Sequence, residues 1–234
     1  MEFEPNFSPE KNKEQEKTDK EKEWEEIINN LEETEDKLGM KIDEGIKETV
    51  AAFQAHKLPT TQSCEGHIKE EGKPYPWIEV ADTEKPEEQY IGENKVIQEI
   101  AKEKGISFDF LKRYWKAHPE DISREKRRAL QEVVKKFSKD LKNYTKEFKE
   151  WKRKNKELRK KAEKLIEEFY QEHNYSGTRI KIKDIGFRSR IISIDEKEKS
   201  FKDFTTEEKE EILEERQKEM DDFTKFLKDK YFKN

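Results

Sequence analysis

The feature that most restricts the fold of this chain is a long series of apolar positions that alternate steps of three and four residues. The series runs without a break, and its single amide member is Asn155. This spacing is typical of a heptad seam on one face of a helix. We therefore predict one very long helix over about residues 121–173, roughly 80 Å long at 1.5 Å per residue. The seam positions are Val134, Phe137, Leu141, Tyr144, Phe148, Trp151, Asn155, Leu158, Ala162, Leu165 and Phe169.

The composition limits the size of the hydrophobic core and indicates the cellular compartment. Of 234 residues, 30% are hydrophobic and 46% are charged, so a modest core must support many solvated helix faces. The single cysteine, Cys64, cannot form an internal disulfide, which favours a reducing compartment. The N-terminus lacks the pattern of a secretory signal, and no apolar run approaches the roughly 20 residues of a membrane span. We expect a cytoplasmic protein that does not enter a membrane.

The remaining patterns predict an α+β fold. Four short segments read as strands, at residues 60–64, 77–80, 179–183 and 187–194. They are not spaced as repeated β-α-β units, so we predict a small, mainly antiparallel sheet packed with helices, plus the very long heptad-patterned helix.

Four regions follow from this reading. Residues 1–22 form a disordered charged tail, and residues 23–118 form the N-terminal part of the α+β domain. Residues 119–174 hold the long basic helix, and residues 175–234 complete the domain with strands and a final helix. Local signals mark helix ends: Asp43 as an N-cap, Gly105 as a C-terminal stop, and a capping box from Thr205 to Glu208.

Charge is segregated along the chain. Residues 124–161 carry about three basic residues for each acidic one, whereas residues 1–36 and 195–222 are biased the other way. We favour an intramolecular explanation, in which the basic helix lies against the chain's own acidic final helix. Nucleic acid, bound through its phosphates, and self-association through the heptad helix are the alternatives.

One place in the chain concentrates chemical groups. A helix that starts near Asp43 and the strand that follows it span about the same length, roughly 20 Å, so the short connection between them must return the strand's end to the helix N-terminus. The returning strand at Trp77 begins at that end as well. We predict a small-ligand pocket there, for a polar or anionic ligand, lined by Asp43, Glu44, Thr61, Ser63, Cys64, Gly66, His67 and Trp77.

Three other interpretations of this place stay open. Cys64 and His67 are weak metal-ligand candidates, because they supply only two of the three or four ligands of a zinc site; Asp43, Glu44 or Glu65 could supply another. Alternatively, Cys64, His67 and Glu65 are candidates for catalytic roles in an enzyme with a thiol nucleophile. Finally, Cys64 could be a buried core residue and Gly66 could serve a turn with positive φ.

The same residues carry a resemblance. The segments Thr60-Thr61-x-Ser63-Cys64-Glu65-Gly66-His67 and Pro74-Tyr75-Pro76-Trp77 resemble an uncharacterised family of candidate-phylum bacteria, which implies no known activity. A looser similarity links residues 60–67 to the tRNA wybutosine-synthesis methyltransferases, which implies S-adenosylmethionine and RNA modification. In this chain, Glu65 and His67 replace a serine and an arginine of that motif.

The sequence therefore gives three hypotheses of different classes. The first is a small-ligand-binding or regulatory module with its pocket at residues 60–67. The second is an enzyme that uses Cys64 and His67, either in RNA modification or with the help of a metal. The third is a helical scaffold for protein–protein interaction. Neither the cofactor nor the ligand is identified by these patterns.

Overall fold

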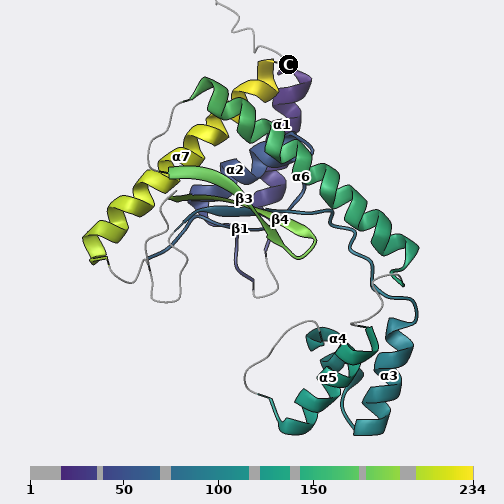
Figure 1. Ribbon diagram of the computed structural model, residues 1–234. Helices are drawn as coiled ribbons and strands as arrows, with labels where there is room; N and C mark the ends of the chain where they lie inside the picture. The colour runs from purple at the N-terminus through teal and green to yellow at the C-terminus, as the bar shows by residue number, and fades with distance from the viewer. Residues whose placement is uncertain are drawn as a thin grey trace, which may run out of the picture.

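The computed structural model describes residues 17–35, 39–68, 75–115, 122–137, 143–173, 178–195 and 204–233. Within these residues the chain is an α+β protein, as predicted, with a four-stranded sheet and seven helices (Figure 1). The elements in chain order are α1 Asp19–Glu32, α2 Glu44–Ala55, β1 Thr60–Cys64, β2 Trp77–Val80, α3 Glu93–Lys104, α4 Phe108–Tyr114, α5 Arg124–Phe137, α6 Lys146–Glu172, β3 Thr178–Ile185, β4 Arg188–Asp195 and α7 Thr206–Lys233.

The four strands form one antiparallel sheet in the order β1-β2-β4-β3. The central pair is β2 with β4, in which Ile78 lies opposite Ile191 and Glu79 lies opposite Arg190. Because side chains alternate between the faces of a strand, this register places the isoleucines on one face and the charged pair on the other. Figure 1 shows α1, α2, α6 and α7 on one side of the sheet.

The main core lies between these helices and the isoleucine face. It joins Ile78 and Ile191 to aromatic side chains of three helices: Phe53 of α2, Phe169 of α6 and Phe223 of α7. Phe223 is the centre of this group, with its ring centroid 5.1 Å from Phe169 and 6.0 Å from Phe53. Each such buried side chain contributes about 1.5–3 kcal/mol relative to exposure. None of the helices that the structure describes is both long and apolar enough to cross a membrane.

A second core belongs to α3, α4 and α5. These helices form a separate lobe below the sheet in Figure 1 and enclose their own apolar cluster. Leu111 of α4 is fully buried at its centre. The cluster contains Ile97, Ile100, Ala101, Leu111, Trp115, Ala129, Leu130, Val133 and Phe137. This three-helix lobe is inserted into the chain between β2 and α6.

The prediction of one very long helix is wrong. Residues 121–173 contain two helices, α5 and α6, and Tyr144 between them forms an antiparallel bridge with Tyr90. Backbone bonds fix this extended segment: Ile91 N–H donates to Asn143 O (2.9 Å) and Thr145 N–H to Gln89 O (2.9 Å). The Thr145 hydroxyl then caps α6 by accepting from the Phe148 N–H at 3.1 Å. Pairing with a distant, earlier segment therefore overrides the heptad spacing; Leu141 lies outside the described residues.

The seam positions from Phe148 onward are largely buried inside the protein's own fold. Phe148 and Phe169 are fully buried, whereas Val134 of α5 is exposed. Asn155 is satisfied within the chain: its Oδ1 accepts from the Asp82 N–H at 2.8 Å and its Nδ2 donates to Trp151 O at 3.0 Å. The spacing in α6 is thus explained by packing on the sheet and on α7, without a second copy of the helix.

The predicted boundary of the N-terminal tail at residue 22 is also wrong. Helix α1 begins at Asp19, because Thr18 and Glu21 form a capping box that satisfies both the Thr18 and the Glu21 backbone N–H groups. The expectation of disorder for residues 1–16 concerns residues outside those described.

Two local predictions of helix ends are confirmed. Gly105 ends α3 in a left-handed conformation with φ of +62°. The capping box before α7 is present: Thr205 N–H donates to Glu208 Oε2 (2.8 Å), and Glu208 N–H donates to Thr205 Oγ1 (3.2 Å).

The expected pairing of a basic helix with the acidic final helix holds only in part. Helix α6 packs on α7, but α5 belongs to the three-helix lobe. The ion pair described between α6 and α7 has the opposite polarity, with Lys230 of α7 on Glu168 of α6 at 2.9 Å. The charges of α5 therefore require a separate explanation.

Candidate functional site

The strand β1 returns its end to the start of α2, as predicted. The chain reverses after α2 through Lys57, which adopts a positive φ of 54°, and β1 then runs back beside the helix. As a result, the residue before α2 contacts the residue after β1: the Glu65 N–H donates to Asp43 Oδ2 at 3.2 Å. The start of α2 and the end of β1 thus lie side by side.

Glu65 caps α2 in place of Asp43. Its Oε2 accepts from the Gly45 N–H at 2.9 Å, whereas Asp43 occupies the N-cap position without a side-chain bond to its own helix. The predicted N-cap position of Asp43 is confirmed, but the capping hydrogen bond comes from the Glu65 side chain instead of from Asp43. A Cβ at Gly45 would lie 2.7 Å from Glu65 Oε2, so the close approach of this carboxylate depends on the glycine. Because the Glu65 carboxylate already accepts from the Gly45 N–H, that amide at the helix N-terminus is not available to an anionic ligand.

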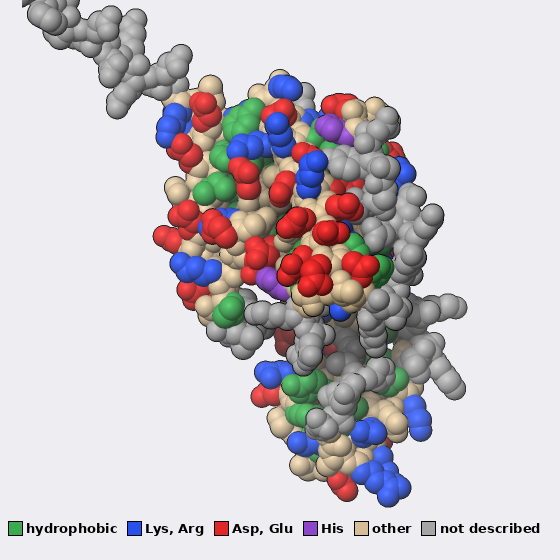
Figure 2. All heavy atoms as spheres, turned by 90° about the vertical axis from the view of Figure 1, so that its left-hand side faces the viewer, with side chains coloured by type: hydrophobic (Ala, Val, Ile, Leu, Met, Phe, Trp, Pro, Cys, Tyr) green, Lys and Arg blue, Asp and Glu red, His purple; other side chains and the backbone are tan. Residues whose placement is uncertain are grey.

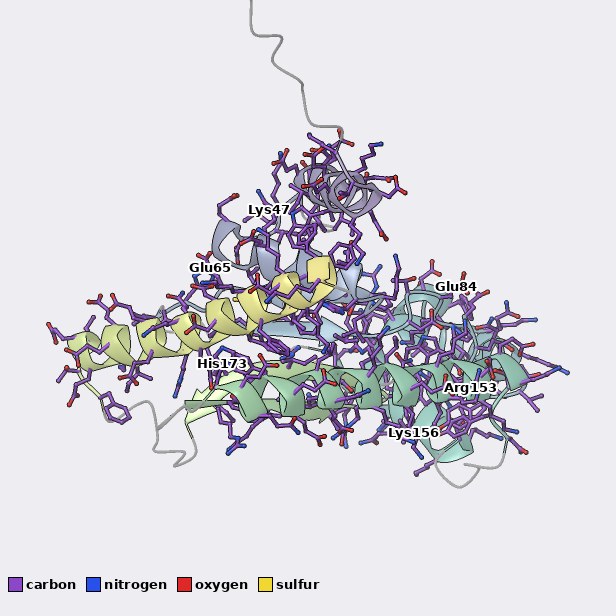
Figure 3. The ribbon with its side chains drawn as sticks, turned by 90° about the horizontal axis from the view of Figure 1, so that it is seen from above. Lys47, Glu65, Glu84, Arg153, Lys156 and His173 are labelled. Carbon is purple, nitrogen blue, oxygen red and sulfur yellow. The ribbon has the colours of Figure 1, made fainter. Side chains whose placement is uncertain are left out.

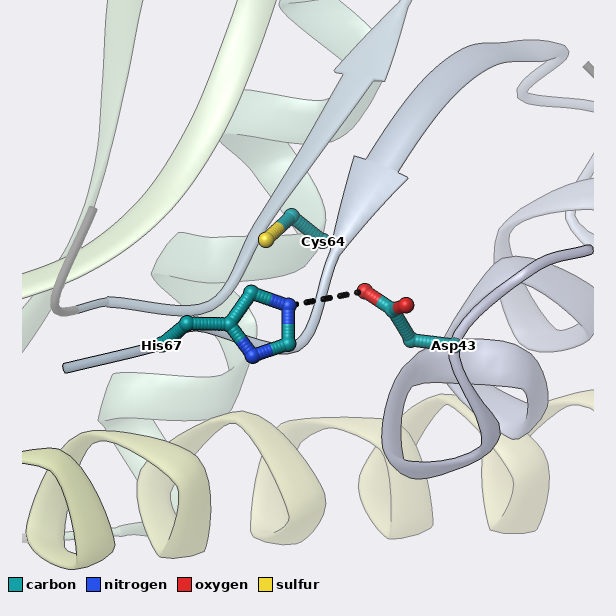
Figure 4. A group of neighbouring side chains, drawn as sticks. All are labelled: Asp43, Cys64 and His67. Carbon is teal, nitrogen blue, oxygen red and sulfur yellow. Dashed lines mark ion pairs between the residues drawn. The ribbon is translucent and has the colours of Figure 1, made fainter. Parts of the chain in front are cut away.

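With its carboxylate free of the helix, Asp43 points towards Cys64 and His67 (Figure 4). One ligand atom of each side chain, an oxygen, a sulfur and a nitrogen, lies within 4.8 Å of the other two. Asp43 Oδ2 is 3.6 Å from His67 Nε2, and both side chains are partly exposed, at 34% and 41%. We call these three residues the tripod. The two weak metal-ligand candidates of the sequence thereby gain a third donor.

The environment of Cys64 keeps its thiol protonated. Burial raises the pKa of the Cys64 thiol above its ordinary value, and the carboxylates of Asp43 and Glu65 act in the same direction. Hydrogen bonds from the Gly66 N–H, at 3.4 Å from Sγ, and from the Trp77 side chain lower the pKa by less. A nucleophilic cysteine needs the opposite shift, so this geometry gives no support to a free thiolate nucleophile.

Gly66 allows the chain to turn between Cys64 and His67. Its φ is +92°, and a Cβ there would lie 2.7 Å from Leu213 Cδ1, 2.9 Å from the Tyr75 carbonyl carbon and 3.1 Å from Pro76 N. The turn is also held by α7, because Gln217 Nε2 donates to Glu65 O at 3.0 Å. The predicted positive-φ role of Gly66 is confirmed, and the last helix of the chain supports the loop.

The other predicted site residues are placed differently: Glu44 and Thr61 have partners outside the tripod, whereas Trp77 lies beside Cys64. Glu44 points to solvent with its side chain 87% exposed and pairs with Lys47. Thr61 donates from its hydroxyl to Glu79 Oε1 at 2.9 Å. Ser63 is half-buried on β1, and Trp77 lies opposite Cys64 in the strand register. The face of the Trp77 indole carries the Arg190 guanidinium, 3.9 Å from the ring centroid, so this face is not open to a ligand.

A buried charged cluster on the face of the sheet opposite the core isoleucines was not predicted from the sequence. The Glu79 side chain is 0% exposed and accepts from Arg188 Nη1 at 2.5 Å and from Arg190 Nη2 at 3.3 Å. The signal was available, because the alternation in Trp77-Ile78-Glu79-Val80 places Glu79 on the face opposite the core isoleucine. A buried carboxylate with two arginines and a threonine hydroxyl is satisfied within the chain.

A cavity of about 480 Å³ lies elsewhere, where α6 begins. Its walls include Asp82, Glu84, Glu150 and Lys154, and none of the predicted site residues lines it. Figure 3 shows Glu84 on the side of the molecule away from Glu65. Lys154 Nζ is 3.1 Å from Asp82 Oδ2, so part of the negative charge is neutralised by the chain itself.

Comparisons with protein-family models, with curated proteins and with solved structures found no match. The resemblances of residues 60–67 therefore stay predictions. The function has to be argued from the chemistry of the tripod and from the surfaces around it.

Proposed function

We propose that the protein is a small-ligand-binding module whose ligand is a divalent transition-metal ion, held by Asp43, Cys64 and His67. The observation that carries the proposal is the convergence of one oxygen, one sulfur and one nitrogen within 4.8 Å. Zinc prefers this set of donors, and three protein ligands with a fourth position open to water or a small molecule are typical of zinc sites that do not serve folding alone.

The spacing of the donors supports a metal over a hydrogen-bonded pair. The 3.6 Å between Asp43 Oδ2 and His67 Nε2 is too long for a good hydrogen bond. It is close to the edge of a tetrahedron about a zinc ion, roughly 3.5 Å for metal–ligand bonds of about 2.0–2.3 Å. Small movements of these partly exposed side chains would close the remaining distance to Cys64 Sγ.

The charges near the tripod favour a cation over the polar or anionic ligand of our first hypothesis. Two carboxylates, Asp43 and Glu65, lie at the end of β1, and the N-terminus of α2 is already bonded to one of them. A cation in the tripod would be stabilised by Asp43 directly and by Glu65 at longer range. It would also deprotonate Cys64, because a metal-bound thiol loses its proton.

The proposal is tested by calorimetric titration of the full chain with Zn²⁺ and with Co²⁺. We expect one ion per chain and a proton released on binding, visible as an enthalpy that depends on the ionisation heat of the buffer. Co²⁺ should give the charge-transfer absorption of a thiolate–cobalt bond. Cys64→Ser should abolish that absorption and weaken binding at least tenfold, roughly 1.4 kcal/mol.

A matched pair of variants distinguishes metal binding by the tripod from a general effect of removing one carboxylate. Asp43→Asn should weaken Zn²⁺ binding, whereas Glu44→Gln, at the neighbouring and 87% exposed position, should leave it unchanged. Equal effects of the two variants, or Zn²⁺ binding that is unaffected by Cys64→Ser, would refute the tripod as the metal site.

A further inference from the structure

The connection between α3 and α4 is the starting point of a second inference, which is independent of the metal proposal. Helix α3 ends at Gly105, and the Ile106 N–H donates back to Ala101 O at 2.9 Å. Ser107 then caps α4, with its hydroxyl accepting from the Phe110 N–H at 3.5 Å. Two helices joined by a three-residue turn that contains glycine are the elements of a helix-turn-helix unit.

The third helix of the lobe completes this unit. Helix α5 begins after Ser123, whose hydroxyl accepts from the Lys126 N–H at 3.4 Å, and it contributes Ala129, Leu130 and Val133 to the shared core. Leu111 of α4 is fully buried in that core. The inner face of α4 is therefore fixed by packing, and its outer face is held in a defined direction.

Next to its fully buried side, α4 carries two half-buried aromatic rings that pack on the core of the lobe and lie beside exposed cations of α4 and α5. Arg113 is exposed, and its guanidinium carbon lies 6.0 Å from the ring centroid of Tyr114. Tyr114 is 5.0 Å from Phe110, and the exposed Lys126 of α5 lies 4.6 Å above the Phe110 ring. Together these side chains make one continuous surface, which we call the α4–α5 patch: Phe110, Arg113, Tyr114 and Lys126.

The lobe differs in charge from the rest of the chain. Residues 93–137 carry twelve Lys and Arg against eight Asp and Glu, whereas the remainder carries 39 against 48. Figure 2 shows Lys and Arg side chains spread over the lower lobe, and Asp and Glu gathered on the upper domain towards the start of α7. The exposed cations at the start of α5 are Arg124, Lys126, Arg127 and Arg128. A basic lobe on an otherwise acidic chain favours a polyanionic partner that binds to the lobe and not to the rest of the protein.

We propose that the α3–α5 lobe binds duplex DNA, with α4 in the major groove. A helix is roughly 10–12 Å across with its side chains, which matches a major groove about 12 Å wide. Arg113 is placed to reach base edges, where arginine binds the O6 and N7 acceptors of guanine. Lys126 and the start of α5 lie beside it, where they contact the phosphate backbone.

The geometry favours duplex DNA over RNA. A helix fits the wide major groove of B-form DNA, whereas the major groove of an RNA duplex is too deep and narrow for side chains to read. An unpaired strand would instead need open aromatic faces for base stacking, and the Phe110 ring is covered by Lys126.

The test is fluorescence anisotropy of the full chain with a labelled mixed-sequence DNA duplex of about three helical turns, at several salt concentrations. We expect binding that weakens as salt increases, because cations on the lobe displace counterions from phosphates. The double variant Arg113→Gln, Lys126→Gln should bind at least tenfold more weakly. It should also lower the slope of log K against log salt by about 0.9 for each phosphate that the lobe no longer neutralises. Both residues are exposed, so the variant should unfold at the same temperature as the wild type.

The control is Arg153→Gln on α6, an exposed arginine held by Glu150 and Glu157, which should bind DNA as the wild type does. A selection from random duplexes should enrich a short guanine-containing motif, and Arg113→Gln should abolish that preference. The proposal is overturned if the duplex fails to bind at low salt, if the double variant binds like the Arg153→Gln control, or if an RNA hairpin of equal length binds more tightly and is the probe that the variants weaken.

Discussion

Replacing Gly66 by alanine tests how tightly the loop of the tripod is built. In the structure its φ is +92°, and a Cβ would lie within 3.1 Å of Leu213 Cδ1, the Tyr75 carbonyl carbon and Pro76 N. The positive φ costs a side-chain-bearing residue about 1–2 kcal/mol. Forcing a methyl group against two backbone atoms adds about 1–3 kcal/mol. Alanine also lowers the conformational entropy of the unfolded chain, which offsets roughly 0.5 kcal/mol of this cost. The sum is a destabilisation of about 3 kcal/mol.

Gly186→Ala is the matched control. Gly186 also has a positive φ, of +64°, but its Cβ would meet nothing within 4 Å. We therefore expect a destabilisation of about 1 kcal/mol or less at Gly186, from backbone strain alone. Urea unfolding followed by circular dichroism measures both, and a decrease of about 3 kcal/mol lowers the midpoint by roughly 1–2 M for a slope of about 2 kcal/mol/M. Equal midpoints for the two variants would refute the close packing of the Gly66 turn.

Three further predictions concern the Cys64 thiol, the half-buried His56 and the Asn155 amide of the seam. Because burial raises the pKa of Cys64, its alkylation by iodoacetamide should reach half its maximal rate above the free-thiol pKa of about 8.5; a midpoint below that value would contradict the described environment. Burial lowers the pKa of His56, whose Nε2 lies 2.8 Å from Leu227 O, so the unfolded chain binds a proton more readily. The free energy of unfolding should therefore fall as pH drops below about 6.5, and His56→Gln should reduce that slope in urea titrations at several pH values. Asn155→Leu leaves the Asp82 N–H without its acceptor and should cost about 1–3 kcal/mol; sedimentation should show no change in oligomeric state, since a change would restore the role of this amide in self-association.

The reversal of α2 into β1 was predictable because it depends on local lengths. A helix and a strand of equal span joined by a short turn leave one arrangement, and the bond from the Glu65 N–H to Asp43 confirms it. Which carboxylate caps the helix was not predictable in the same way. Asp43 has the sequence position of a cap, but Glu65 reaches Gly45 from the far end of β1 and takes that role, which frees Asp43 for the tripod.

The helix-turn-helix unit was missed for a related reason. Its local signals, Gly105 and Ser107, are visible in the sequence, but the third helix was absorbed into the heptad series. The spacing of three and four continues through Tyr144, although that residue is extended and paired with Tyr90. Periodicity reports which positions are apolar, and it does not report where a distant segment pairs with the backbone. The separate core of the lobe follows only once that pairing is known.

The bridge between Tyr90 and Tyr144 has a consequence for how such a chain is assembled. The segments that enter and leave the three-helix lobe are hydrogen-bonded to each other, so the ends of the insert meet at a single point on the host. The α+β domain without the lobe would need only a tight turn at this point. Its sheet, its helices and the loop of the tripod would keep their contacts. Loss, gain or exchange of the insert is then a local genetic event, which would leave related chains with the same host and different appendages.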